Sequence, residues 1–225
     1  MRLKSLFTLF LLFFVFSSPC LARDDFQYRS LYTFKIIDTK KIDFSLFNQV
    51  RFFNDAQDVG FYSISPKLQY EWMKNMSLGL NYTYLQTKVF NKTAGREEFK
   101  FHHRVELDAN PHFERGDWLK IQMRNRYEFR WIEDRGSWNP RFRHRTQVEF
   151  PLKNKLPLQS IYINSEFFYD IDKHVYNENW TTPLGFKFKI NEKTSLSLYY
   201  MIQRIGVSND WSSNQILGTH LLVNF

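Results

Sequence analysis

The chain has 225 residues, including 24 Phe, 12 Tyr and 6 Trp, and its formal net charge is +8. After residue 22, no segment approaches the roughly 20 continuous apolar residues that a membrane-spanning helix needs. The basic residues are mixed with glutamates along the whole chain rather than gathered in a tail or one helix, which argues against a nucleic-acid partner.

The first 22 residues have the layout of a secretory signal peptide. A short basic start, Met1–Lys4, precedes an apolar run from Leu6 to Phe16 and then a group of small residues. We predict cleavage after Ala22, so that residues 23–225 form a single domain. The alternative is a lipoprotein signal with Cys20 lipidated, although the proline before it suits lipidation poorly. After cleavage no cysteine remains, and no disulfide can form.

Beyond the signal, apolar and polar residues alternate with a period of two almost everywhere, and no helical period is sustained. This alternation predicts eleven candidate strands. They are Tyr28–Ile37, Ile42–Phe53, Tyr62–Trp72, Met76–Tyr84, Phe99–Ala109, Leu119–Trp131, Arg141–Phe150, Ile161–Tyr169, Leu184–Ile190, Ser195–Ile205 and Leu217–Phe225.

The links between these strands alternate in length. Met73–Asn75 and Asn191–Lys193 are predicted to be tight turns. Longer polar links are expected at Asn54–Gly60, Lys88–Arg96, Ile132–Ser137, Ile171–Asn179 and Gly206–Ser213. Short turns on one rim and longer loops on the other are typical of outer-membrane β-barrels, in which the turns are periplasmic.

The strand number conflicts with the even counts of single-chain bacterial barrels. Eleven candidates therefore imply either ten wall strands or twelve with one not recognised. We favour ten, with the segment Tyr28–Ile37 outside the wall.

The last strand ends in an aromatic residue at the end of the sequence. Its alternate positions are largely apolar and resemble the signal that the barrel-assembly machinery of the outer membrane reads. These positions are Leu217, Thr219, Leu221, Val223 and Phe225. The pattern as a whole predicts an all-β fold, a closed antiparallel transmembrane β-barrel of about 10–12 strands in the bacterial outer membrane.

A soluble lipocalin-like barrel has the same alternation turned inside out, with apolar side chains within. Periodicity does not separate the two. The terminal Phe, a strand number above eight and aromatic residues near the expected bilayer interfaces favour the membrane barrel. These interfacial residues are Tyr70, Trp72, Tyr82, Tyr84, Tyr127 and Trp131.

Several segments together resemble a bacterial outer-membrane β-barrel family that is catalogued as a domain of unknown function, number 2490. They are SLGLNYTY (Ser77–Tyr84), FHHRVELD (Phe101–Asp108), RNRYEFRW (Arg124–Trp131), RFRHRTQVEFPL (Arg141–Leu152), TSLSLYY (Thr194–Tyr200) and GTHLLVNF (Gly218–Phe225). The resemblance covers nearly the whole mature chain. It implies the fold and the location, and it lends no catalytic residue and no substrate.

If the apolar faces meet lipid, the charged faces line the lumen. The predicted basic wall consists of Lys100, Arg104, Lys120, Arg124, Arg126, Arg130, Arg141, Arg143 and Arg145. The predicted lumen acids are Glu106, Asp108, Glu128 and Glu149. Because a barrel of ten or twelve strands has little more room than its side chains fill, we expect at most a narrow pore.

Three functions remain open. A basic lumen favours a narrow porin-like channel that attracts small anionic solutes. Alternatively, an Arg–Glu network fills the lumen, and the barrel has a structural or surface-interaction role with lipopolysaccharide or a partner. An envelope hydrolase built on His102 or His220 is the third, but no serine accompanies these histidines and no metal or phosphate-binding motif is present. We therefore expect no enzyme activity, no metal and no cofactor. The expected partners are outer-membrane lipid, lipopolysaccharide and the assembly machinery.

Overall fold

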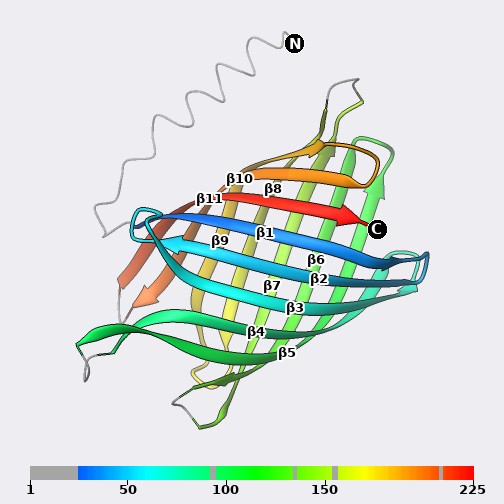
Figure 1. Ribbon diagram of the computed structural model, residues 1–225. Coiled ribbons are helices and arrows are strands. Elements are labelled where there is room, and N and C mark those ends of the chain that lie inside the picture. Colours follow the sequence, from blue (N-terminus) through cyan, green and yellow to red (C-terminus); the bar gives the residue numbers. More distant parts are fainter. Residues whose placement is uncertain (1–24, 92–94, 134–135, 154–156, 208–209) are drawn as a thin grey trace.

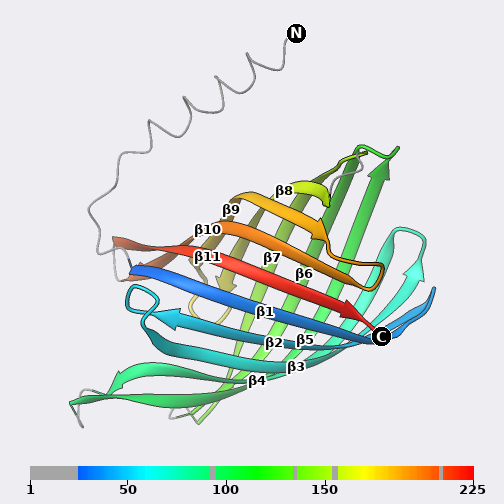
Figure 2. The same cartoon turned by 45° about the horizontal axis from the view of Figure 1, so that its top comes forward.

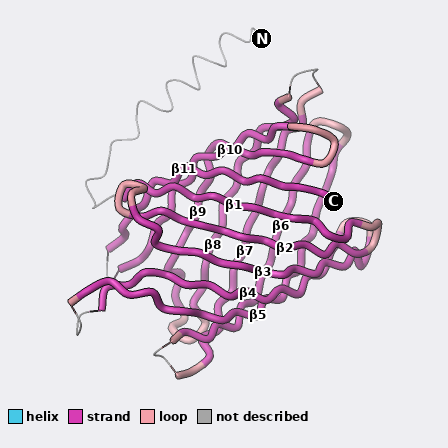
Figure 3. Tube along the Cα trace, viewed as in Figure 1, coloured by secondary structure: helices cyan, strands magenta, loops and turns pink. Residues whose placement is uncertain are grey.

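The computed structural model describes residues 25–91, 95–133, 136–153, 157–207 and 210–225. The predicted signal peptide lies outside them. In this part of the chain the regular structure consists of eleven strands (Figures 1 and 3). They are β1 (Asp25–Asp38), β2 (Ile42–Phe53), β3 (Asp58–Met73), β4 (Met76–Asn91), β5 (Arg96–Arg115), β6 (Leu119–Ile132), β7 (Trp138–Pro151), β8 (Leu158–Asp170), β9 (Val175–Lys189), β10 (Thr194–Val207) and β11 (Asp210–Asn224). None of the described residues belongs to a helix long and apolar enough to cross a bilayer.

The strands form one closed barrel in which consecutive strands pair antiparallel. The barrel closes where β1 pairs with β11, and this pair is parallel, with a register that runs from Asp25 opposite Asn214 to Lys35 opposite Asn224. Figure 2 shows the two strands side by side, with β11 ending at the carboxy terminus. The predicted all-β closed barrel is thus confirmed.

The preference for ten strands, with Tyr28–Ile37 outside the wall, was wrong. All eleven candidate segments contribute wall strands. When every pair is antiparallel, strand directions alternate around the ring, and the ring closes only with an even number. One parallel pair removes this restriction and permits an odd number of strands.

The links between strands are short at both rims. Among the links that the structure describes in full, those on the rim that holds Phe225 are at positions 39–41, 74–75, 116–118 and 190–193. Those on the other rim are at positions 54–57 and 171–174. The expected contrast between short turns and longer loops is therefore absent, because the strands continue through most of the polar segments assigned to loops.

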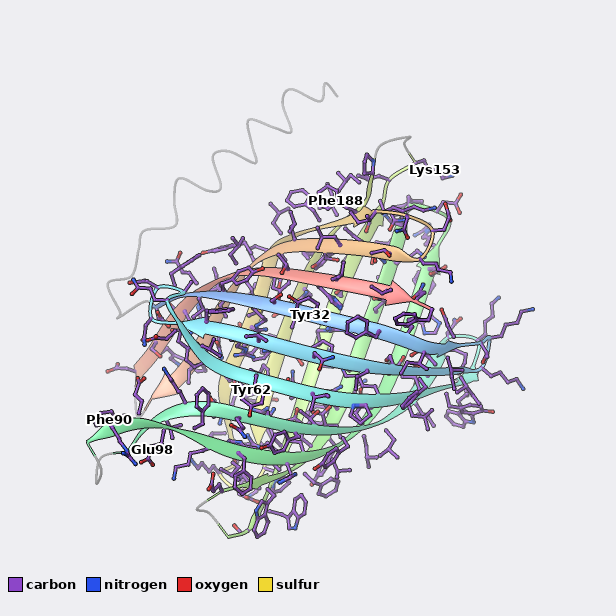
Figure 4. All side chains as sticks on the ribbon, in the orientation of Figure 1. Tyr32, Tyr62, Phe90, Glu98, Lys153 and Phe188 are labelled. Atoms are coloured by element: carbon purple, nitrogen blue, oxygen red, sulfur yellow. The ribbon has the colours of Figure 1, made fainter. Side chains whose placement is uncertain are left out.

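Neighbouring residues on a strand point to opposite sides of the wall. On β4, Leu80 is 52% exposed on the outer surface, whereas Asn81 is 1% exposed and points inward. Most of the buried side chains are polar or charged, and many large apolar side chains are exposed. In Figure 4, Tyr32 and Tyr62 lie on the outer side of the wall. The inside-out alternative, with an apolar lumen and a polar exterior, is therefore wrong for this barrel.

Two glycines make room for tyrosine rings inside the barrel. Gly218 lies opposite Tyr199 on the neighbouring strand, and a Cβ atom at Gly218 would come within 2.0 Å of the tyrosine ring. Gly185 lies opposite Tyr162 in the same way, with a corresponding distance of 2.2 Å. A glycine within a strand permits this close approach.

The first residue of β1 anchors the neighbouring turn. Three successive residues after β2, Asn54, Asp55 and Ala56, have positive φ angles. This backbone turns successive N–H groups toward one point, a geometry that binds anions. The Asp25 carboxylate accepts hydrogen bonds from the amides of Asn54 and Asp55, at 3.3 and 3.0 Å. The start of β1 is thereby fixed to the rim of the barrel.

We predict that a disulfide will join β1 to β11 when Ser30 and Thr219 are both replaced by cysteine. These residues are opposite each other in the parallel register, and their hydroxyl oxygens are 3.4 Å apart. Adjacent strands lie within the Cα separation that a disulfide needs. The oxidised double variant should migrate faster on a denaturing gel without reductant.

The matched control is S30C/T146C, because Thr146 lies on β7 and is not adjacent to β1 in the sheet. Equal cross-linking in the two double variants, or none in S30C/T219C, would contradict the parallel closure.

Candidate functional site in the barrel lumen

The barrel encloses a cavity of about 980 Å³. Its lining extends from Phe53 and Phe61 near one rim to Lys35, Asp43 and His112 near the other. Among the described residues, ten basic and six acidic side chains line this cavity. The lumen therefore has a formal excess of positive charge.

A continuous network of ion pairs covers the wall from β5 to β9. It begins at Arg126 on β6, whose guanidinium donates two hydrogen bonds to Asp108 on β5, at 2.6 and 2.7 Å. The same guanidinium lies 2.5 Å from the carboxylate of Glu106. All three side chains are buried, so each charge depends on its partners for the stabilisation that water would otherwise give.

Glu128 is at the centre of the network and is 0% exposed. Its carboxylate accepts hydrogen bonds from Arg141 Nε at 2.8 Å and from Arg143 Nη1 at 2.5 Å. These arginines are two positions apart on β7, and the strand period therefore points both of them inward. The buried carboxylate of Glu128 therefore has two positively charged partners.

Two more acids extend the network to β8 and β9. Glu166 accepts from Arg124 at 2.6 Å and from Arg143 at 2.9 Å. Glu178 accepts from Arg141 at 3.3 Å, and its other oxygen accepts from the Trp180 indole. Five adjacent strands are thus joined through side chains as well as through the backbone.

The predicted basic residues fall into two groups. Six line the cavity, namely Arg104, Arg124, Arg126, Arg141, Arg143 and Arg145. Arg130 is buried outside the cavity and donates to the side chain and the backbone carbonyl of Asn139. Lys100 is half-buried and does not line the cavity. Lys120 lies near the rim, where it pairs with the exposed Glu114 at 2.8 Å.

The four predicted acids are all buried. Glu106 and Asp108 line the cavity. Glu128 lies within the network behind it, and Glu149 accepts a hydrogen bond from Ser160 at 2.7 Å.

Several lumen residues were not recognised in the sequence. Arg29 on β1, Arg51 on β2 and Lys67 on β3 line the cavity on another part of the wall. Within the described residues, none of these three cations forms an ion pair. Glu166, Glu178 and Trp180 were missed as well. The alternation of apolar and polar residues was a usable signal on β1 and β2. Glu178 lies in the predicted polar link Ile171–Asn179, and Trp180 lies between that link and the next predicted strand, Leu184–Ile190.

Aromatic rings separate the arginines in the lumen. The Trp180 ring has the guanidiniums of Arg29, Arg51 and Arg143 at 4.4, 4.9 and 5.4 Å from its centroid. Phe168 lies against Arg143 in the same manner, at 4.5 Å. These contacts bring side chains from β1 and β2 together with side chains from β7, β8 and β9, so the lumen is narrow at this level.

One of the predicted histidines lies in the lumen. His220 faces the lumen and is hydrogen-bonded to Thr33 at 2.8 Å. Among the described residues there is no group of His, Cys, Asp and Glu side chains able to hold a metal ion. The five alternate positions of the terminal segment, from Leu217 to Phe225, continue the outward face of β11.

We predict that Glu128→Gln will lower the free energy of unfolding by about 3 kcal/mol, because two buried guanidiniums lose their shared counter-charge. Guanidinium-induced unfolding of the detergent-solubilised barrel, followed by tryptophan fluorescence, measures the change. The matched control is Glu114→Gln, which breaks an exposed rim pair and should cost no more than about 0.5 kcal/mol. Equal stability of the two variants would show that the network does not hold the wall together.

The comparisons with known proteins identify a family. Neither a curated protein nor a solved structure matches the chain. The model of a family described as "Protein of unknown function (DUF2490)" matches residues 27–214, which cover β2 to β10 in full, most of β1 and part of β11. The chain belongs to this family.

Proposed function

We propose that this protein is an integral outer-membrane β-barrel with a narrow, basic lumen that passes small solutes and prefers anions. The observation that carries the proposal is the combination of an apolar outer surface with a polar cavity whose lining has excess positive charge. Soluble monomers rarely expose large continuous apolar surfaces. A barrel wall in contact with lipid needs a continuous apolar surface.

The outer surface supports the membrane location. Its exposed apolar residues are found on strands all around the barrel. They include Leu68, Leu80, Leu107, Phe129, Ile163, Phe167, Leu198 and Leu217. The strands have 12 to 20 residues, more than the roughly 9–11 residues that cross a bilayer at the usual tilt. Every strand is therefore long enough to span, and the longer ones extend beyond the hydrocarbon.

Exposed aromatic residues lie near both rims, as expected for the two interfaces of a bilayer. Near the rim of Phe225 they include Tyr70, Trp72, Phe113 and Trp118. Near the opposite rim they include Phe90, Trp138, Tyr176 and Trp211. Three residues of the sequence-based set do not lie at a loop end: Tyr82 and Tyr84 lie within β4, which continues to Asn91, and Tyr127 lies near the middle of β6.

The charges of the lumen support anion preference. Arg104, Arg145 and Lys67 line the cavity and form no ion pair among the described residues. Unpaired cations in a confined space raise the local concentration of anions. Under this proposal the network on β5–β9 has a structural role, and the unpaired cations act on the solute.

A second candidate is a barrel that does not conduct. Two observations favour it: the ion-pair network fills one wall, and the arginines stacked on Trp180 narrow the lumen. In that case the protein has a structural role or binds lipopolysaccharide or another partner at its rims. Conductance separates the two candidates directly.

We predict single-channel currents when the purified barrel is inserted into planar bilayers, with a reversal potential in a KCl gradient that indicates chloride preference. The double variant K67Q/R145Q removes two unpaired lumen charges and should shift the chloride-to-potassium permeability ratio toward one. The control K120Q removes a rim charge that is already paired, and its ratio should stay close to that of the wild type.

Silent bilayers at high loading of folded protein would reject conduction and leave the second candidate. Currents without ion preference, or equal ratios in K67Q/R145Q and K120Q, would reject the role of the basic lumen.

A further inference from the structure

Arg29 and Arg51 form a pair of like charges inside the barrel. They are directly opposite each other in the register of β1 and β2, and they are only 4% and 9% exposed. Like charges at opposing positions of an antiparallel pair destabilise it. Burial increases the cost, because water screens the repulsion less.

The carboxylates of the lumen do not neutralise this pair. Glu178 and Glu166 are the acids with an attractive effect on Arg29. However, Glu178 is hydrogen-bonded to Arg141, and Glu166 is hydrogen-bonded to Arg124 and Arg143. Neither Arg29 nor Arg51 has a carboxylate within ion-pair distance in the described residues. Two buried positive charges thus face the cavity without a counter-charge of their own.

Hydrogen-bond donors at this place are also unused. Within the described residues, the buried Nε and Nη2 atoms of Arg29 make no hydrogen bond of good geometry, and neither does the hydroxyl of Tyr199, which lies beside Arg29. The other terminal nitrogen of Arg29, Nη1, contacts the Met201 sulfur at 3.8 Å, which is a weak acceptor. A buried donor without an acceptor costs free energy, and a bound acceptor would recover it.

Trp180 holds the two guanidiniums in place. Its ring packs against Arg29 and Arg51 with centroid distances of 4.4 and 4.9 Å, and Arg51 is also packed on Phe61 at 4.8 Å. Stacking positions both guanidinium groups, which suits flat, two-point recognition of a carboxylate or phosphate. The N–H groups without an acceptor belong to Arg29, whereas Nε and Nη2 of Arg51 donate to the side-chain oxygen of Gln49 when its amide is placed in the orientation that satisfies both groups.

We propose that Arg29, Arg51 and the Tyr199 hydroxyl form a binding site for the oxyanion group, carboxylate or phosphate, of a small solute in the lumen. Both arginines and Tyr199 line the same cavity. The site deepens the proposed function and rests on its solute-filled lumen, but binding at this site does not require that the barrel conducts. The apolar side chains of Met201 and Ile216 pack with Tyr199 beside it.

Calorimetric titration of the folded barrel in detergent micelles tests this site with two probes, inorganic phosphate and benzoate, each against sodium chloride at equal ionic strength. We expect at least one probe to bind more tightly than chloride. R29Q and R51Q should each weaken that binding at least tenfold, because two-point recognition is lost. The control K120Q, with the same change in charge at the rim, should stay within twofold of the wild type.

A further variant, Y199F, removes only the hydroxyl and keeps the ring over Gly218, so it tests the site even if an arginine variant does not fold. It should weaken binding about threefold. If R29Q or R51Q folds, it should unfold at a higher temperature than the wild type in chloride, and the probe should raise its unfolding temperature less than that of the wild type.

Binding of neither probe above chloride, or equal binding by the wild type, R29Q, R51Q and Y199F, would overturn the proposal. Because the titration needs no current, silent bilayers would reject the channel and leave this result unchanged. Binding confined to phosphate or to benzoate would identify which oxyanion the site selects.

Discussion

The strand period of two, imposed on a closed sheet, is the constraint on which the other features of this molecule depend. Every second side chain must point into a lumen of limited volume, and most of the buried side chains are polar or charged. Charges confined in this way need partners, and Asp108, Glu128 and Glu166 provide them for the arginines of β6 and β7. The remaining side chains point outward and give the barrel its apolar exterior.

The lumen is divided into two unlike parts. From β5 to β9, arginines and acids neutralise one another, and this wall is held by charge pairs as well as by backbone hydrogen bonds. On β1 to β3, the cations Arg29, Arg51 and Lys67 have no carboxylate partner among the described residues. Under the proposed function, the first part holds the wall together and the second attracts the solute. Trp180 on β9 contacts both parts.

The sequence predicted the closed all-β barrel and the charged strand faces, because alternation is a local property. It did not predict the strand number, which depends on the parallel pairing of β1 with β11, a contact between the two ends of the chain. The missed residues Glu178 and Trp180 lie on β9, where register shifts interrupt the alternation around Thr182. Ion-pair partners such as Glu166 with Arg124 join strands two apart in the barrel, and no local pattern predicts such a pair.

The orientation of the wall is tested most directly by spin labels on two adjacent residues of β3, Leu68 on the outer face and Lys67 in the lumen. Single-cysteine variants, labelled and reconstituted into bilayers, are compared for collisions with oxygen, which concentrates in lipid, and with a water-soluble nickel chelate. We predict that the label at position 68 collides mainly with oxygen and that the label at position 67 does not. Frequent collisions of the label at position 68 with the nickel chelate would contradict a lipid-facing exterior.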